Sequence, residues 1–174
     1  MLIAITGTPG TGKTAAAEEL KSCGYEVRSL TEMLETTSLL NEYDENSDSF
    51  LVDDKALESI EIDHGESTVF VEGHLAHHLA CDMIVVLRCS PEVLESRLEE
   101  RGYGAQKVKD NIEAELLDLI LVESLERKAL TYEIDCSHLR PKEVARSMID
   151  IINGKVDDHI PGKVDWSEEG LKRF

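Results

Sequence analysis

The stretch Gly7-Thr8-Pro9-Gly10-Thr11-Gly12-Lys13-Thr14 decides the fold of this chain. It matches the pattern G-x-x-x-x-G-K-[ST], a glycine-rich loop that joins a buried strand to the start of a helix. The surroundings fit, because the aliphatic run Met1–Thr6 precedes the loop and a helical pattern over Lys13–Cys23 follows it. An ordinary glycine turn would account for the glycines but not for all eight positions. The sequence therefore predicts a phosphate-binding loop.

Each residue type in this loop has a chemical reason. Glycine at positions 7, 10 and 12 lets the backbone adopt positive φ angles and brings its N–H groups close to phosphate oxygens. The start of the helix adds a partial positive charge at the same place. We expect Lys13 to reach the β- and γ-phosphates and the Thr14 hydroxyl to bind Mg²⁺. A nucleoside triphosphate with Mg²⁺ is the predicted ligand.

Outward from the loop, short aliphatic runs alternate with amphipathic helical patterns, which is typical of a parallel sheet flanked by helices. The predicted strands are Met1–Thr6, Tyr25–Ser29, Thr68–Glu72, Asp82–Arg88 and Thr131–Cys136. The predicted helices are Lys13–Cys23, Leu30–Asn41, Asp53–Ile60, Pro91–Gly102, Lys107–Lys128 and Pro141–Asn153. The most apolar strand, Asp82–Arg88, is expected to be central. The tail from Lys155 to Phe174 lacks periodicity, and its Trp166 could fold back on the body or anchor a partner.

The composition fits one acidic domain over residues 1–174. The chain has 18 Lys and Arg against 36 Asp and Glu, for a net charge of −18, and is 41% apolar and 5% aromatic. Such a charge repels nucleic-acid phosphates, so direct duplex binding is not expected, whereas a basic protein partner would be attracted.

No apolar run is long enough to span a membrane and no basic segment precedes the first strand, so we expect a cytoplasmic protein. The four scattered cysteines indicate reduced thiols.

Two classes of nucleotide-binding protein are excluded by features that the sequence lacks. The N-K-x-D motif with which GTP-binding switches recognise guanine is absent, and large ATPase motors need a longer chain. A small P-loop kinase remains.

Carboxylate and imidazole groups follow the strand Thr68–Glu72. Glu72 ends this strand beside the phosphate loop, where an acid can hold Mg²⁺ directly or through water, although a solvated strand end is the alternative. We expect His74 to contact phosphate or position water. His74, His77 and His78 are crowded, but they lack the cysteines or matched carboxylates typical of a zinc site.

Two arginines lie on one face of the helix predicted over Pro91–Gly102. Arg97 and Arg101 are four residues apart, and Gly102 follows as a hinge. Such a pair suits a lid that closes over transferred phosphate charge. Surface ion pairs with neighbouring glutamates are the alternative.

Taken together, these motifs resemble the adenylate kinase isoenzyme 6 type family, also called the coilin-interacting nuclear ATPase type, and its archaeal members in particular. The resemblance rests on GTPGTGKT, on a D-x-H-x-x-H-like strand end, and on RGY followed by K-x-x-(D/E)-N-x-x-A-E, here Arg101–Tyr103 and Lys107–Glu115. It implies a three-layer α/β P-loop NTPase fold of the nucleoside monophosphate kinase type. The central sheet would have five parallel strands in the order 2-3-1-4-5, with helices on both faces.

The resemblance also implies an activity and partners. These are reversible phosphate transfer between ATP and AMP, an accompanying ATPase, and a part in small ribosomal subunit and 16S rRNA maturation with ribosomal protein uS11. A purely metabolic, broad-specificity nucleoside monophosphate kinase without a ribosomal partner is the alternative.

Site residues are carried over by the same resemblance. Arg101 would be the lid arginine, Arg140 would lie near the adenine, the segment that binds the monophosphate would span about residues 30–53, and the lid about residues 101–110. The ATP contacts would be Gly7, Gly10, Thr11, Gly12, Lys13, Thr14 and Ala15.

The sequence departs from the family pattern in two places. Glu72 stands where the family usually has Asp. More seriously, no Lys or Arg occurs between Arg28 and Lys55, although a phosphate dianion entering a cleft needs cationic donors. We therefore predict a poor adenylate kinase whose ATPase is the more relevant activity, unless Arg88, Arg97, Arg101 or the histidines supply the missing clamp.

Overall fold

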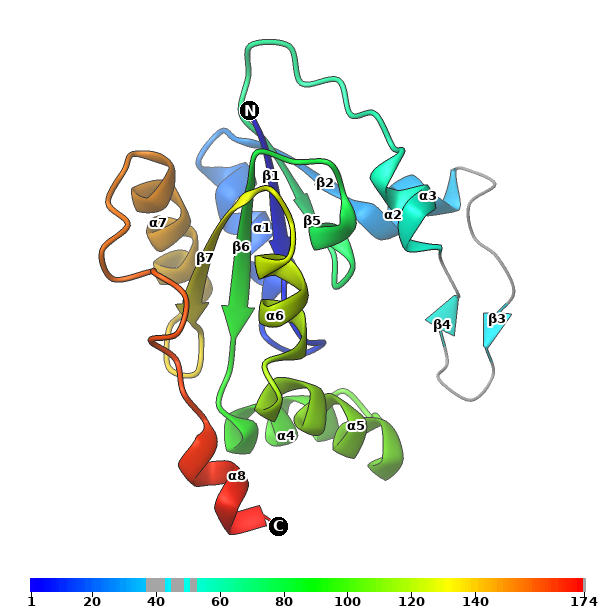
Figure 1. Ribbon diagram of the computed structural model, residues 1–174, viewed down its shortest axis with the longest axis vertical. Helices are drawn as coiled ribbons and strands as arrows, with labels where there is room; N and C mark the ends of the chain where they lie inside the picture. The colour runs from blue at the N-terminus through cyan, green and yellow to red at the C-terminus, as the bar shows by residue number, and fades with distance from the viewer. Residues whose placement is uncertain (37–42, 45–48, 51–52, 174) are drawn as a thin grey trace.

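Five parallel strands form the sheet of this computed structural model, which describes residues 1–36, 43–44, 49–50 and 53–173 (Figure 1). Their order is β2-β5-β1-β6-β7, which confirms the predicted 2-3-1-4-5 arrangement. A separate antiparallel pair, β3 and β4, lies in the segment between α2 and α3. The strands are β1 (Leu2–Thr6), β2 (Glu26–Ser29), β3 (Tyr43–Asp44), β4 (Ser49–Phe50), β5 (Val69–Glu72), β6 (Met83–Arg88) and β7 (Leu130–Asp135).

Helices cover both faces of the sheet (Figure 1). The first strand alternates its side chains between these faces, so that Ile3 and Ile5 pack toward α1 and α7, whereas Leu2 and Ala4 pack toward α2, α3 and α6. The helices are α1 (Lys13–Ser22), α2 (Leu30–Glu35), α3 (Asp54–Glu58), η1 (Ala76–His78, a 3₁₀ turn), α4 (Pro91–Glu100), α5 (Ala105–Leu116), α6 (Leu119–Leu125), α7 (Pro141–Ile152) and α8 (Ser167–Arg173).

The most apolar strand, β6, is an inner strand between β1 and β7, and all six of its residues are buried. Burial on both faces explains why it reads as a continuous apolar run. The middle position of the sheet belongs to β1. Because the carboxyl ends of β1, β5 and β6 lie at one edge, the phosphate loop, Glu72 and Arg88 meet there.

The prediction of one helix over Lys107–Lys128 is wrong. The chain forms α5 and α6, separated at Asp118, which has a φ of 53°. This left-handed conformation is unusual for a residue other than glycine. It is held by an ion pair between the Asp118 carboxylate and Nη2 of Arg88. The apolar spacing continues through the break, so periodicity alone could not reveal it.

The tail that lacks periodicity returns to the body of the protein. His159, Lys163 and Val164 hydrogen-bond to β7, and Trp166 hydrogen-bonds to α5, before the chain enters α8. Much of the segment expected to bind a monophosphate, residues 37–42, 45–48 and 51–52, lies outside the described residues. Within the part of the chain that the structure describes, no helix is long and apolar enough to cross a membrane.

Candidate nucleotide-binding site

The phosphate loop is a tight turn in which Gly7, Gly10 and Gly12 all have positive φ angles that favour glycine. Gly7 has a φ of 137°, and a Cβ added there would lie 2.3 Å from the carbonyl oxygen of Leu87. Gly12 has a φ of 102°, but a Cβ added there would meet no atom within 4 Å. Gly7 is therefore required by the neighbouring strand, whereas Gly12 is required by backbone conformation and borders open space. A phosphate group would fit on this open side of the loop.

Lys13 places a buried cation beneath the loop. Its Nζ donates to the carbonyl oxygens of Gly7 at 2.7 Å and Thr8 at 3.1 Å. Burial lowers the pKa of Lys13 to about 8, although the carboxylates of Glu72 and Glu115 act in the opposite direction. Neutral main-chain carbonyl groups therefore hold the Lys13 ammonium group in place, and this group is mostly charged at neutral pH. A triphosphate would supply the anion that it lacks.

Thr14 and Glu72 come together at the mouth of the loop. The Thr14 hydroxyl, at the start of α1, lies 3.5 Å from Oε2 of Glu72, at the end of β5. A hydroxyl and a carboxylate oxygen are the hard ligands that Mg²⁺ prefers, and Thr14 is exposed to the cleft. The residues present therefore fit the predicted metal.

His74 and His77 differ in their surroundings. Desolvation by the surrounding residues lowers the pKa of His74 to about 4, and the charge on Lys13 adds to this effect. His77 is fully buried, and this burial lowers its pKa to about 3. Both rings are therefore neutral at pH 7, and neither adds a positive charge to the site.

The histidines also approach a carboxylate from α6. His77, His78 and Glu123 offer ligand atoms that all lie within 4.8 Å of one another. Sequence spacing did not indicate Glu123 as their neighbour. However, both ring nitrogens of His77 already have partners, Thr6 Oγ1 at 2.9 Å and Glu123 Oε2 at 3.0 Å. These two hydrogen bonds connect η1 to β1 and α6, so the cluster has a structural role without a metal.

A cleft of about 720 Å³ opens beside the phosphate loop. The loop and the end of β5 form one wall, and the start of α5 and part of α6 form the other. Three cationic side chains line it: Lys13, Arg101 and Lys107. Lys107 also lies 4.8 Å from the centre of the Tyr103 ring. The start of α5 therefore contributes a cation that the sequence reasoning missed, because Lys107 appeared only as part of a family motif.

Comparison with known proteins agrees with this geometry. A family model described as "AAA domain" matches residues 3–118. The curated "Putative adenylate kinase" of Methanocaldococcus jannaschii is 42% identical over 97% of this chain and 94% of its own, and that of Archaeoglobus fulgidus is 41% identical over 97% and 93%. The chain belongs to the archaeal adenylate kinase isoenzyme 6 type family.

Solved structures support the fold of this family member. The deoxyadenosine kinase of M. mycoides matches with a TM-score of 0.56 and 18% identity over 89% of this chain and 100% of its own. The shikimate kinase of Acinetobacter baumannii matches with a TM-score of 0.56 and 15% identity over 88% and 93%. Both confirm the P-loop kinase architecture.

A second hollow, of about 230 Å³, lies on the other side of the loop. It is lined by the loop, Ala15, Arg97, Arg101 and the start of α7. Arg140, which the family pattern places near the adenine, is adjacent to this hollow in the chain but does not line it. Its side chain is 82% exposed and pairs with Glu143 at 3.1 Å. The role of Arg140 therefore stays a prediction.

The three arginines proposed to bind phosphate differ in their partners and in their access to the cleft. Arg97 is tied to the scaffold, because its Nη2 donates to the carbonyl oxygens of Cys136 at 3.0 Å and Ser137 at 3.3 Å. Arg88 is buried and surrounded by carboxylates, so it is not available to a ligand. Arg101 is exposed and lines both hollows. Among these arginines, Arg101 is the one placed to meet phosphate.

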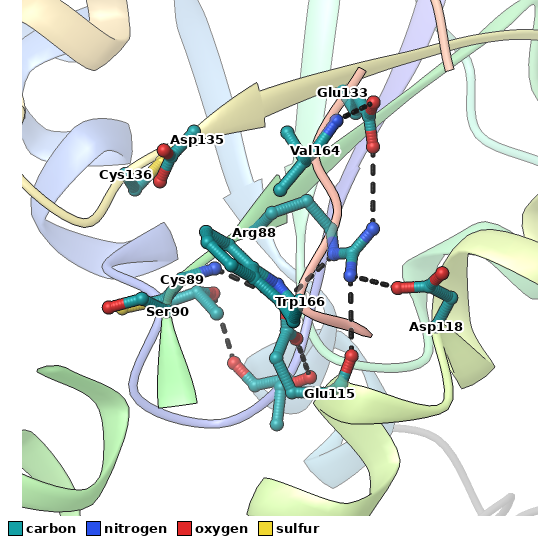
Figure 2. A network of polar contacts seen from close by, with 12 residues as sticks. Arg88, Cys89, Ser90, Glu115, Asp118, Glu133, Asp135, Cys136, Val164 and Trp166 are labelled. Carbon is teal, nitrogen blue, oxygen red and sulfur yellow. Dashed lines mark hydrogen bonds and ion pairs between the residues drawn. The ribbon is translucent and has the colours of Figure 1, made fainter. Parts of the chain in front are cut away.

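Arg88 is the centre of a buried network that the sequence did not suggest (Figure 2). Its guanidinium bonds to Glu115 at 2.7 Å, to Glu133 at 3.3 Å and to Asp118. Glu115 also accepts a hydrogen bond of 2.5 Å from the Thr8 hydroxyl in the phosphate loop. The only sequence signal was the family motif that ends at Glu115, and that motif does not name its partners.

Proposed function

We propose that this protein is a nucleoside monophosphate kinase that converts ATP and AMP to two ADP and also hydrolyses ATP. One observation carries the proposal: Lys13, the Thr14–Glu72 pair and Arg101 all face the same cleft. Such an arrangement of a phosphate loop, a pair of metal-binding oxygens and an exposed cation is what phosphoryl transfer requires. The relatives named as adenylate kinases favour AMP as the acceptor.

The residues divide the reaction between them. An oxygen of the acceptor phosphate attacks the γ-phosphorus of ATP, and the bond from this phosphorus to the bridging oxygen breaks as ADP leaves. Lys13 orients the β- and γ-phosphates, and Arg101 offsets charge on the transferring group. Mg²⁺, held by Thr14 and Glu72, would neutralise phosphate charge. In hydrolysis, the neutral ring of His74 accepts a hydrogen bond from the attacking water.

The cationic side chains in the cleft affect how the acceptor monophosphate binds. Lys107 and Arg101 are placed to replace the arginines that residues 29–54 lack. However, Glu72, Asp110 and Glu123 line the same cleft and oppose the entry of a dianion. We therefore expect slow AMP turnover, with ATP hydrolysis as a comparable activity.

A coupled assay across AMP, CMP, GMP, UMP and no acceptor tests this proposal. AMP should give the fastest ADP formation, and the reaction without acceptor should remain measurable. Mutation of His74 to Ala should reduce hydrolysis more than ATP binding measured by calorimetry. ATP binding without turnover under any of these conditions would contradict the kinase and the ATPase together.

The cellular role belongs to the same proposal. We infer a part in small ribosomal subunit and 16S rRNA maturation with the basic protein uS11, in the cytoplasm. The net charge of −18 suits a basic partner, and the four cysteines are free thiols, as suits a reducing compartment. A pull-down with uS11 should show retention that depends on ATP. Equal retention with and without ATP, or none, would favour the metabolic alternative.

A further inference from the structure

The C-terminal segment, here residues 163–173, is attached to the body of the protein at two buried carboxylates, Glu133 and Glu115 (Figure 2). Oε1 of Glu133 accepts the main-chain N–H groups of Lys163 at 2.7 Å and Val164 at 2.9 Å. Oε1 of Glu115 accepts the indole N–H of Trp166 at 3.3 Å. The tail is thus fastened by hydrogen bonds to charged acceptors, which are stronger than bonds between neutral groups.

Glu115 connects this tail to the phosphate loop. Its side chain is 3% exposed, and it accepts hydrogen bonds from four donors on three segments, which are the phosphate loop, the end of β6 and the C-terminal tail. The donors are the Thr8 hydroxyl at 2.5 Å, Nε of Arg88 at 2.7 Å, the N–H of Cys89 at 3.2 Å and the Trp166 indole. A change at any one donor alters the acceptor that the others share.

Thr8 completes the path to the nucleotide. Its carbonyl oxygen accepts from Nζ of Lys13 at 3.1 Å, while its hydroxyl donates to Glu115. A triphosphate that draws Nζ of Lys13 toward its own oxygens removes the bond to this carbonyl. The loop, Glu115 and Trp166 must then adjust together, because interiors are too tightly packed to absorb such a change locally.

We propose that the C-terminal segment is a positioning element of the nucleotide site, in which Trp166 acts through Glu115 and Thr8 on the phosphate loop. Nucleotide binding and tail docking are then linked, and each strengthens the other by the same factor. This inference rests on the proposed binding of ATP at the loop. Trp166 itself does not line either hollow beside the loop.

Trp166 is the only tryptophan of the chain, so its fluorescence reports on this contact directly. Titration of the full chain with ATP and Mg²⁺ should change the emission of Trp166 with the same midpoint as the binding isotherm from calorimetry. A calorimetric isotherm with no change in emission would overturn the inference and leave the proposed function standing. No isotherm at all would overturn both.

Substitution of Thr8 tests the path. Thr8→Val removes the hydroxyl at nearly constant shape, and Thr8→Ser keeps it. The Ser variant should retain the emission change, whereas the Val variant should lose most of it while calorimetry still detects ATP. An undiminished emission change in Thr8→Val would overturn the proposed path.

Substitution of Trp166 tests the effect on activity and does not depend on the Thr8 variants. Trp166→Phe keeps an aromatic side chain, although a smaller one, and removes the N–H, and we expect the KM for ATP to rise about fivefold with a smaller change in kcat. Leu171→Ala is the matched control in α8, because Leu171 is 83% exposed, and its KM should match that of the wild type. An unchanged KM in Trp166→Phe would show that the tail is merely structural.

Discussion

Two buried cations lie near the phosphate loop, and the protein treats them in opposite ways. Lys13 donates to the main-chain carbonyls of Gly7 and Thr8, and burial lowers its pKa to about 8. Arg88 is surrounded by Glu115, Asp118 and Glu133, and although burial opposes it, the nearby carboxylates raise its pKa.

The difference separates a candidate binding group, Lys13, from a structural group, Arg88. The charge on Arg88 is already neutralised by carboxylates from three elements, so it cannot attract a phosphate. The charge on Lys13 is solvated by uncharged dipoles, and the cost of burying it is recovered when an anion arrives. A buried cation that lacks close ion pairing is therefore a better indicator of an anion site than burial or charge alone.

The largest expected effect comes from removing the binding cation. Lys13→Ala should lower the rate of ADP formation by about 10³-fold or more, because it removes a main electrostatic contact to the transferring phosphate. Its unfolding free energy should not fall, because a desolvated charge disappears from the interior. A coupled assay and urea denaturation measure the two quantities. Full activity in this variant would disprove the site.

Removing the structural cation should have the opposite profile. Arg88→Met leaves Glu115 and Glu133 buried without their counter-ion, and we expect a loss of about 3–5 kcal/mol in the free energy of unfolding. Urea denaturation is the measurement. Arg28→Met is the matched control, because Arg28 pairs with the half-exposed Glu26 and should cost no more than about 1 kcal/mol. Equal losses of unfolding free energy in the two variants would contradict a structural role for Arg88.

The pH dependence of binding sharpens the comparison further. The proton on Lys13 is fully present below its pKa of about 8 and is lost as the pH rises through it. ATP affinity should therefore be constant up to about pH 7 and fall up to about tenfold per pH unit above 8. Calorimetry at pH 7, 8 and 9 checks this. Lys13→Arg stays charged, and its affinity should not decline over this range.

The smallest expected effect concerns the backbone at Asp118. Both Asp118→Gly and Asp118→Ala remove the ion pair to Arg88, so their difference isolates the cost of a φ of 53°. Alanine should be less stable than glycine by about 1 kcal/mol. Thermal or urea unfolding of the two variants provides the test, and equal stability would show that the α5–α6 junction relaxes freely.

Most of the fold could be predicted because it depends on local patterns. The alternation of apolar runs and amphipathic segments predicted all five strands of the main sheet, and the loop motif indicated where the candidate site lies. The break at Asp118 could not be predicted, since its cause is a partner thirty residues away on β6. Apolar spacing continues across it.

The candidate site was predictable to the same extent. The loop residues are contiguous, so their arrangement follows from the motif. Glu115, Glu133 and Trp166 come from distant segments, and the docking of the tail depends on hydrogen bonds that leave no periodic apolar pattern. Bulk charge was no guide either, because a chain with a net charge of −18 still presents Lys13, Arg101 and Lys107 to one cleft.

The anchoring of Arg97 has a mechanical consequence for α4. Its guanidinium fastens this helix to the carbonyl groups that follow β7. We therefore expect any closing of α5 over the cleft to bend the chain at the turn after Glu100, where Gly102 has a φ of 77°, rather than to move α4. Lys107 would then shift across the cleft while Arg101, which precedes this turn glycine, stays in place.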